Sequence, residues 1–135
     1  MLTDFTFEGS VGIRYEGKHF DLHSFFSIVR LSISPKEGTV LLEFESIREF
    51  MDQVHGVKAL GLQFSGITYL ELSPKICTNV SDSLEEFGFK ASIDRDDDWL
   101  KTVEQSEIGD HLFVRLSSLE FIRIQCAAAR VVLPG

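Results

Sequence analysis

Residues 26–44, FSIVRLSISPKEGTVLLEF, decide the fold, because two apolar runs flank a short polar segment. Apolar and polar residues alternate toward Ile33, and the alternation starts again at Val40. This pattern is typical of β-strands that bury one face. Between the runs, Pro35 pre-sets φ for a turn and Gly38 can adopt a positive φ. The stretch therefore predicts two antiparallel strands joined by a tight turn.

The same alternation extends to both ends of the chain. Residues 2–15 predict a hairpin that turns near Gly9, and residues 111–133 predict two or three strands in succession. Within the second region, the run Ala127-Ala128-Ala129 is unusual because alanine has a low preference for strands. We expect these alanines to fill space beside bulky phenylalanines. The alternative is that they leave a groove for a small ligand or a partner.

A change of period after residue 46 indicates short helices. One apolar stripe has helical spacing, at Ile47, Phe50, Met51 and Val54. Ser46 and Glu49 have the spacing of a capping box, and Gly56 is placed to end the helix. Two shorter helices are predicted at residues 82–87, after Ser81, and at residues 99–103.

Together these elements predict an α+β fold in a single globular domain spanning residues 1–135. We expect a mostly antiparallel β-sheet or sandwich of about seven to nine strands, with one to three short helices packed on it. The chain is long enough to bury one core but too short for two independent ones.

The composition describes an acidic chain. Its 135 residues include 13 Lys and Arg against 21 Asp and Glu, a net charge of −8. A negative field repels phosphate, which counts against a nucleic-acid partner. No apolar run approaches the roughly 20 residues of a membrane helix, and the first residues lack the pattern of a secretory signal. We therefore expect a soluble, cytoplasmic protein without a membrane partner, whose Cys77 and Cys126 are free thiols. A disulfide between them is the alternative.

The first candidate site is the segment HFDLH, residues 19–23. On a strand, His19, Asp21 and His23 would share one side while the two apolar residues point to the other. Two imidazoles and a carboxylate suit a divalent metal ion, and they can also transfer protons. The alternative is an ordinary strand with its polar face in water and no cofactor.

The second candidate site is the acidic segment before Trp99. Its candidate partner-binding residues are Asp94, Asp96, Asp97, Asp98 and Trp99. The alternating carboxylates resemble the start of a calcium loop, but Trp99 stands where such a loop needs glycine and Gln105 where it needs glutamate. An EF-hand is therefore excluded, and clustered carboxylates beside an aromatic anchor suit a basic protein partner instead. The alternatives are a solvated acidic loop and a buried Trp99.

The sequence lacks the short motifs that announce nucleotide-binding loops, nucleophile elbows and zinc proteases. A non-enzymatic function is therefore the simpler expectation. The first hypothesis is an acidic protein-binding domain, in the manner of a bacterial immunity or inhibitor protein that neutralises a basic partner. The alternatives are a metal-binding module or metal-dependent enzyme using His19, Asp21 and His23, and a small-ligand-binding module with its pocket near the alanine run.

Overall fold

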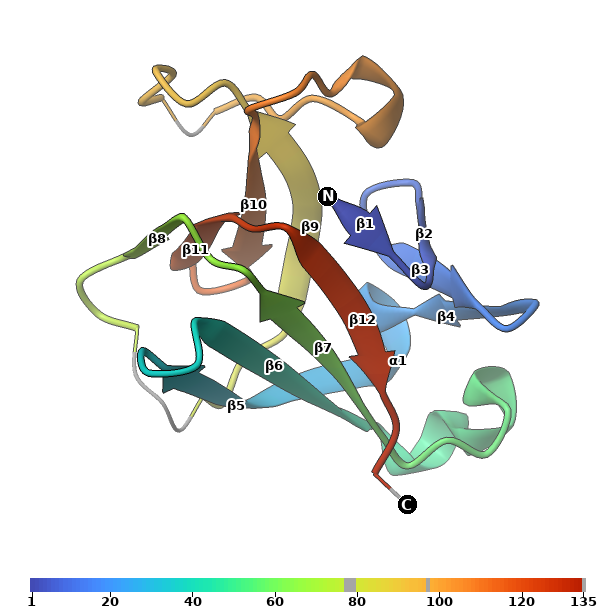
Figure 1. The fold of residues 1–135 in the computed structure, drawn as a ribbon. Helices are drawn as coiled ribbons and strands as arrows, with labels where there is room; N and C mark the ends of the chain where they lie inside the picture. The colour runs from blue at the N-terminus through green and yellow to red at the C-terminus, as the bar shows by residue number, and fades with distance from the viewer. Residues whose placement is uncertain (77–79, 97, 135) are drawn as a thin grey trace.

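The computed structural model describes residues 1–76, 80–96 and 98–134, in which the chain forms three β-sheets (Figure 1). Sheet A has the strand order β1-β12-β7-β6-β5. Its strands are β1 (Leu2–Thr3), β5 (Phe26–Ser34), β6 (Thr39–Ser46), β7 (Ala59–Ser65) and β12 (Ala128–Val132). The predicted central hairpin is confirmed, since Phe26 pairs with Ser46 and Ser34 with Thr39.

The other two sheets pack beside sheet A. Sheet B has the order β2-β3-β4, and its strands are β2 (Thr6–Glu8), β3 (Gly12–Tyr15) and β4 (Lys18–Asp21). Sheet C has the order β8-β11-β10-β9, and its strands are β8 (Tyr69–Leu72), β9 (Leu84–Lys90), β10 (His111–Leu116) and β11 (Phe121–Gln125). All pairings are antiparallel except that between β1 and β12. The α+β class is confirmed, although the described residues form twelve strands rather than seven to nine.

The helices are shorter and tighter than the sequence predicts. A four-residue helix, α1 (Leu22–Phe25), follows β4 directly. Residues 48–54 form the 3₁₀ helix η1 (Arg48–Val54), which is interrupted by non-helical angles at Phe50, and no side chain caps its start. The predicted capping box is therefore wrong. The Ser46 hydroxyl turns instead to the backbone oxygen of Lys58 and to the sulfur of Met51.

Two further helix predictions need correction. Residues 82–87 do not form a helix, because most of them belong to β9, which pairs along its length with β10. Of residues 99–103, only the last is helical, at the start of the 3₁₀ helix η2 (Val103–Gln105). Backbone pairing in sheet C outweighs the local preference for helix in the first case. In the second case, the chain must stay extended at Lys101, which pairs with Phe89.

One hydrophobic cluster draws on all three sheets. Its largest buried rings are Phe20, Phe26, Phe44 and Phe64, each no more than 1% exposed. Within the alanine run, Ala129 is buried and pairs with Phe64 of β7, whereas Ala127 is exposed and packs against Gly66. The space-filling interpretation is therefore supported for Ala129 only. No helix among the described residues is long and apolar enough to cross a membrane.

Candidate functional site

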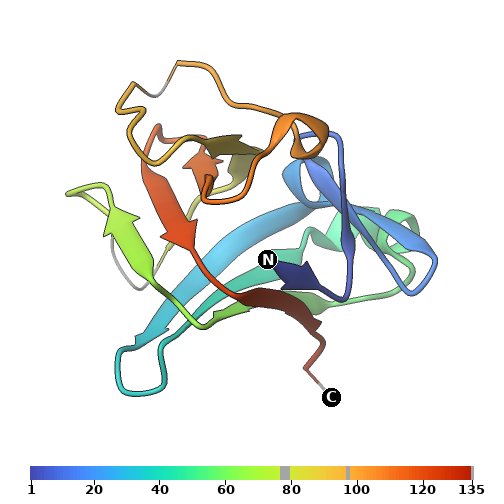
Figure 2. The ribbon, with the colours of Figure 1, turned by 45° about the horizontal axis from the view of Figure 1, so that its top comes forward.

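The connection between β9 and β10, residues 91–110, accounts for most of the net negative charge of the chain. It contains seven acidic and two basic residues, a net charge of −5 out of −8. The connection crosses one end of sheet C, at the top of Figure 1, and Figure 2 places it in the same position. All the predicted partner-binding residues lie on it, although Asp97 falls outside the described residues. We call residues 91–110 the acidic connection.

A buried lysine holds the first part of the acidic connection. The side chain of Lys90 is 2% exposed, and its Nζ donates to Asp96 Oδ1 at 2.8 Å and to Asp94 Oδ2 at 3.4 Å. The hydrogen bond from Lys90 is the main reason that the pKa of Asp96 lies below its usual value. A buried ammonium needs such partners, because leaving it unpaired is costly. Asp94 and Asp96 therefore shape the loop as well as charging it.

Arg95 ties the same loop to the edge strand of sheet C. Its Nη2 donates to both carboxylate oxygens of Glu71, at 2.7 and 2.8 Å. Tyr69 donates a further hydrogen bond to Glu71 at 2.6 Å. The hydrogen bond from Arg95, followed by that from Tyr69, holds the pKa of Glu71 below its usual value. This arrangement fixes the loop at a second point.

A third anchor lies beneath the loop, in sheet C itself. Arg123 is 2% exposed; its Nε donates to His111 Nδ1 at 2.9 Å and its Nη2 to the backbone oxygen of Ala91 at 2.8 Å. The His111 ring stacks on Tyr69, with ring centres 4.5 Å apart. Burial is the main cause of the lowered pKa of His111, and the charge of Arg123 lowers it further. The imidazole is therefore neutral and accepts a hydrogen bond at Nδ1.

The second half of the acidic connection is held by backbone contact. Phe89 and Lys101 exchange two backbone hydrogen bonds of 2.9 Å. Leu100 packs so closely on Gly88 that a Cβ there would lie 2.3 Å from the Leu100 Cβ. Lys101 also forms an ion pair with Asp110 at 2.8 Å. Burial raises the pKa of Asp110, but the hydrogen bonds from Lys101 and the Glu107 backbone and the charge of Lys101 together outweigh it, so the net pKa is lowered. The acidic connection is thus fixed to sheet C at several points.

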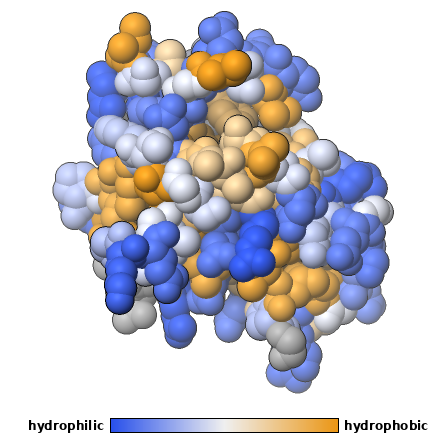
Figure 3. Space-filling model, viewed as in Figure 1, coloured by the Kyte–Doolittle hydropathy of each residue, from blue (hydrophilic) through white to orange (hydrophobic). Residues whose placement is uncertain are grey.

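Large apolar side chains project from this fixed acidic surface. Trp99 is 64% exposed, so the alternative of a buried tryptophan is wrong. Ile93 and Ile108 are more exposed still. In the space-filling view, isolated hydrophobic groups stand among hydrophilic ones at the end of the molecule that carries the connection (Figure 3). An exposed tryptophan on a segment rich in carboxylates is the feature on which a binding surface for a basic partner can be proposed.

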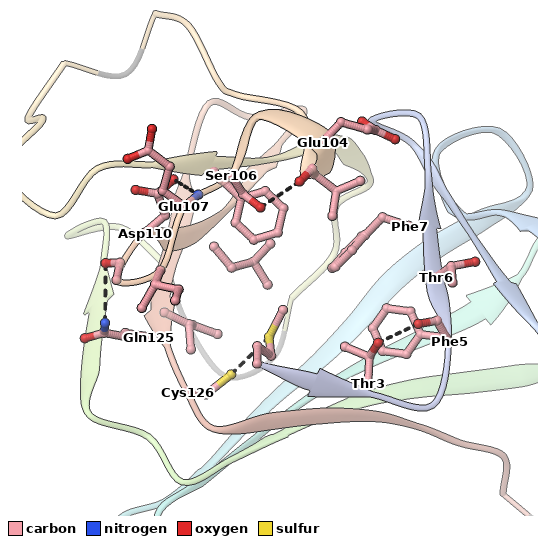
Figure 4. Close-up of a pocket in the computed structure, with 17 residues that line it drawn as sticks. Thr3, Phe5, Thr6, Phe7, Glu104, Ser106, Glu107, Asp110, Gln125 and Cys126 are labelled. Atoms are coloured by element: carbon pink, nitrogen blue, oxygen red, sulfur yellow. Dashed lines mark hydrogen bonds between the residues drawn. The ribbon is translucent and has the colours of Figure 1, made fainter.

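A cleft of about 610 Å³ lies between the acidic connection and the first strands of the chain (Figure 4). Its apolar wall includes Phe7, Phe89 and Leu112, and its rim carries Glu104 and Glu107. Gln125 and Cys126 line its far edge, but Ala127, Ala128 and Ala129 do not line it. Cys126 is a free, half-buried thiol whose pKa is raised by burial. Cys77 falls outside the described residues.

The residues of the predicted metal site have separate partners. His19 Nδ1 lies 2.6 Å from Glu8 Oε2, and His23 Nδ1 lies 2.5 Å from the backbone oxygen of Leu84. Asp21 caps α1 by accepting from the Ser24 backbone N–H at 2.9 Å. Within residues 1–76, 80–96 and 98–134, no three His, Cys, Asp or Glu side chains are grouped to hold a metal ion. Metal binding by these residues therefore stays a prediction.

The sequence reasoning missed the buried basic groups beneath the connection. Lys90 ends an apolar strand, and Arg123 stands between two buried isoleucines in β11. Such positions are ordinarily assigned to a solvated face. The one signal in the sequence is the high density of carboxylates in residues 91–110, which favours basic side chains on a neighbouring strand. In comparisons with protein families, with curated proteins and with solved structures, the chain matches none.

Proposed function

We propose that this protein is a non-catalytic binding domain that recognises a basic protein partner through its acidic connection. The exposure of Trp99, 64% on a segment with a net charge of −5, is the observation that carries the proposal. Tryptophan is among the residues that contribute most to protein–protein affinity when they become buried. Carboxylates around such an anchor attract a positive surface and orient its approach.

The rigidity of the surface supports the same proposal. Lys90, Arg95 and Leu100 each fix a different part of the connection to sheet C. A surface that is ordered before binding loses little conformational entropy when the partner docks. An inhibitor or immunity protein that neutralises a basic toxin or enzyme is the concrete form of this proposal, and a cytoplasmic location fits it.

The proposal is tested by comparative capture from an extract of the cells that make the protein. The binding variants are Trp99→Ala and a triple change, Asp98→Asn with Glu104→Gln and Glu107→Gln. These three acids are exposed, and none forms an ion pair in the described part of the chain. The matched control neutralises three exposed acids elsewhere, Glu37, Glu45 and Glu49.

We expect a basic protein to be captured by the wild type and by the control triple variant. Its capture should be strongly reduced by Trp99→Ala and by the triple change on the connection. Equal capture by all four proteins, or loss only with the control variant, would show that another surface binds the partner. A captured protein without a basic surface would also contradict the proposal.

A further inference from the structure

We propose that the cleft beside the acidic connection is a separate binding site for small organic cations with an apolar body, such as arylalkylamines. The cleft lies between β2 and the β9–β10 connection, with part of sheet C behind it (Figure 4). Its volume of about 610 Å³ falls within the range of small-molecule sites, roughly 300–1,000 Å³. Trp99 does not line it, so this site is distinct from the proposed protein-binding anchor.

The wall of the cleft suits an aromatic or aliphatic group. Phe7 is half-buried, and its ring makes edge contacts with Phe5 and Phe89, at centre distances of 5.2 and 5.7 Å. Leu112 and Ile124 continue the apolar wall on sheet C. An apolar ligand group placed here would be removed from water, which is favourable, and the side chains of the wall would not have to become ordered when it binds. The wall alone selects for apolar groups but not for charge.

The charge of the lining selects for a cation. The acidic side chains Glu104, Glu107 and Asp110 line the cleft, whereas no lining side chain is basic. Asp110 is paired with Lys101, and the α-amino group of Met1 adds a positive charge near Cys126 in the lining. Glu104 and Glu107 form no ion pair within the described residues, so their charges are available to a ligand.

Two neighbouring polar groups of the lining are already satisfied within the protein. The Ser106 hydroxyl donates to the Val103 backbone oxygen at 2.7 Å, and the Gln125 amide donates to the Gly109 oxygen at 3.3 Å. A ligand that needs many hydrogen bonds, such as a sugar, would find few free partners there. An ammonium group on an apolar body needs only the carboxylates and the wall.

The test compares 2-phenylethylamine with 2-phenylethanol, which keeps the ring and tether but replaces the ammonium by a neutral hydroxyl. Binding is followed by amide chemical shifts, with Ser106 and Gly109 as reporters of the cleft. Glu104→Gln with Glu107→Gln removes the two free charges, and Glu37→Gln with Glu49→Gln is the matched control. Phe7→Ala removes the ring that points into the cleft from β2 (Figure 4). The intact chain is used throughout.

We expect the amine to shift the reporter amides and to bind more tightly than the alcohol. The Glu104/Glu107 change should weaken amine binding about threefold to tenfold while leaving the alcohol unaffected. Phe7→Ala should weaken the binding of both probes, whereas Trp99→Ala and the control pair should change neither. Equal binding of amine and alcohol, shifts that map outside the cleft, or amine binding unchanged by Phe7→Ala would each overturn the proposal. Failure of protein capture would not affect this result, so the two proposals are tested independently.

Discussion

The Nζ of buried Lys90 donates a 2.8 Å hydrogen bond to Asp96, a residue of the acidic connection whose own side chain is largely exposed. One carboxylate of the acidic surface therefore serves a structural purpose. Asp98, two residues further on, donates its backbone N–H to Asp96 Oδ1 at 3.0 Å, and its carboxylate forms no ion pair with the described residues. Two acidic residues that are only two positions apart in the sequence thus have different roles.

This difference predicts different effects on stability. Asp98→Asn should change the free energy of unfolding by no more than about 0.5 kcal/mol, as for other exposed positions. Asp96→Asn should lower it by clearly more, because the buried Lys90 ammonium then keeps only the more distant Asp94 as a charged partner. Denaturant unfolding measures both. The double variant Lys90→Met with Asp96→Asn should recover stability, and equal effects of the two Asn substitutions would contradict the anchoring role of Lys90.

The contact between Gly88 and Leu100 predicts a steric effect. Gly88→Ala would place a methyl group 2.3 Å from the Leu100 Cβ, so the connection must move away from sheet C. Overpacking of this kind costs about 1–3 kcal/mol. Leu100→Gly removes the obstructing atoms, so it should reduce the cost of Gly88→Ala in a double-mutant cycle followed by denaturant unfolding. Additive effects of the two changes would argue against this packing.

The neutral state of His111 predicts a pH dependence. In the unfolded chain, His111 gains a proton as the pH falls through about 6.5, while burial and Arg123 keep it neutral in the folded protein to a lower pH. Protonation of His111 therefore favours the unfolded state. The contribution of neutral His111 to the free energy of unfolding is full above pH 6.5 and is lost as the pH falls below that value. His111→Gln, which keeps an acceptor for Arg123, should show a smaller loss of stability between pH 7 and pH 5. An identical loss in both proteins would contradict a lowered pKa.

The metal prediction for His19, Asp21 and His23 has a direct test in thermal melting. A metal ion would have to replace the contacts of His19 with Glu8 and of His23 with the Leu84 carbonyl. If the three residues bind zinc, manganese or nickel, the metal at 100 times its dissociation constant should stabilise the protein by about 2.7 kcal/mol. His23→Ala should abolish that gain. No shift with any of the three metals would contradict the prediction.

The sequence predicts the fold best where one face of a strand meets water. In residues 26–44 the alternation is visible, and both strands and their turn are found as predicted. In β9, by contrast, the last four residues are all buried, because the acidic connection covers the second face of sheet C. The alternation is lost there, and Leu84 and Phe87 then have the three-residue spacing of a helix. The strand β9 and its covering by the acidic connection were both missed because this covering removes the alternation from the sequence of β9.

The acidic residues of the candidate site could be predicted from the sequence, but the buried basic side chains that hold them in place could not. Local composition identifies Asp94, Asp96, Asp98 and Trp99, since clustering along the chain is a property of the sequence. Which carboxylate pairs with Lys90 depends on where β9 ends relative to the loop that follows it. The cleft depends on contacts between the start of the chain and residues 103–112, which no local pattern reveals.

The most direct test of the proposed binding surface is the association kinetics of the captured basic partner, measured over a range of salt concentrations. The triple change at Asp98, Glu104 and Glu107 should slow association and flatten its dependence on salt, because charges at the edge of an interface act mainly on the association rate. Trp99→Ala should weaken binding by on the order of 2 kcal/mol, with the stability of the protein changed by no more than about 0.5 kcal/mol. The control triple variant should behave as the wild type. Unchanged association rates, salt dependence and affinity in both connection variants would contradict the account.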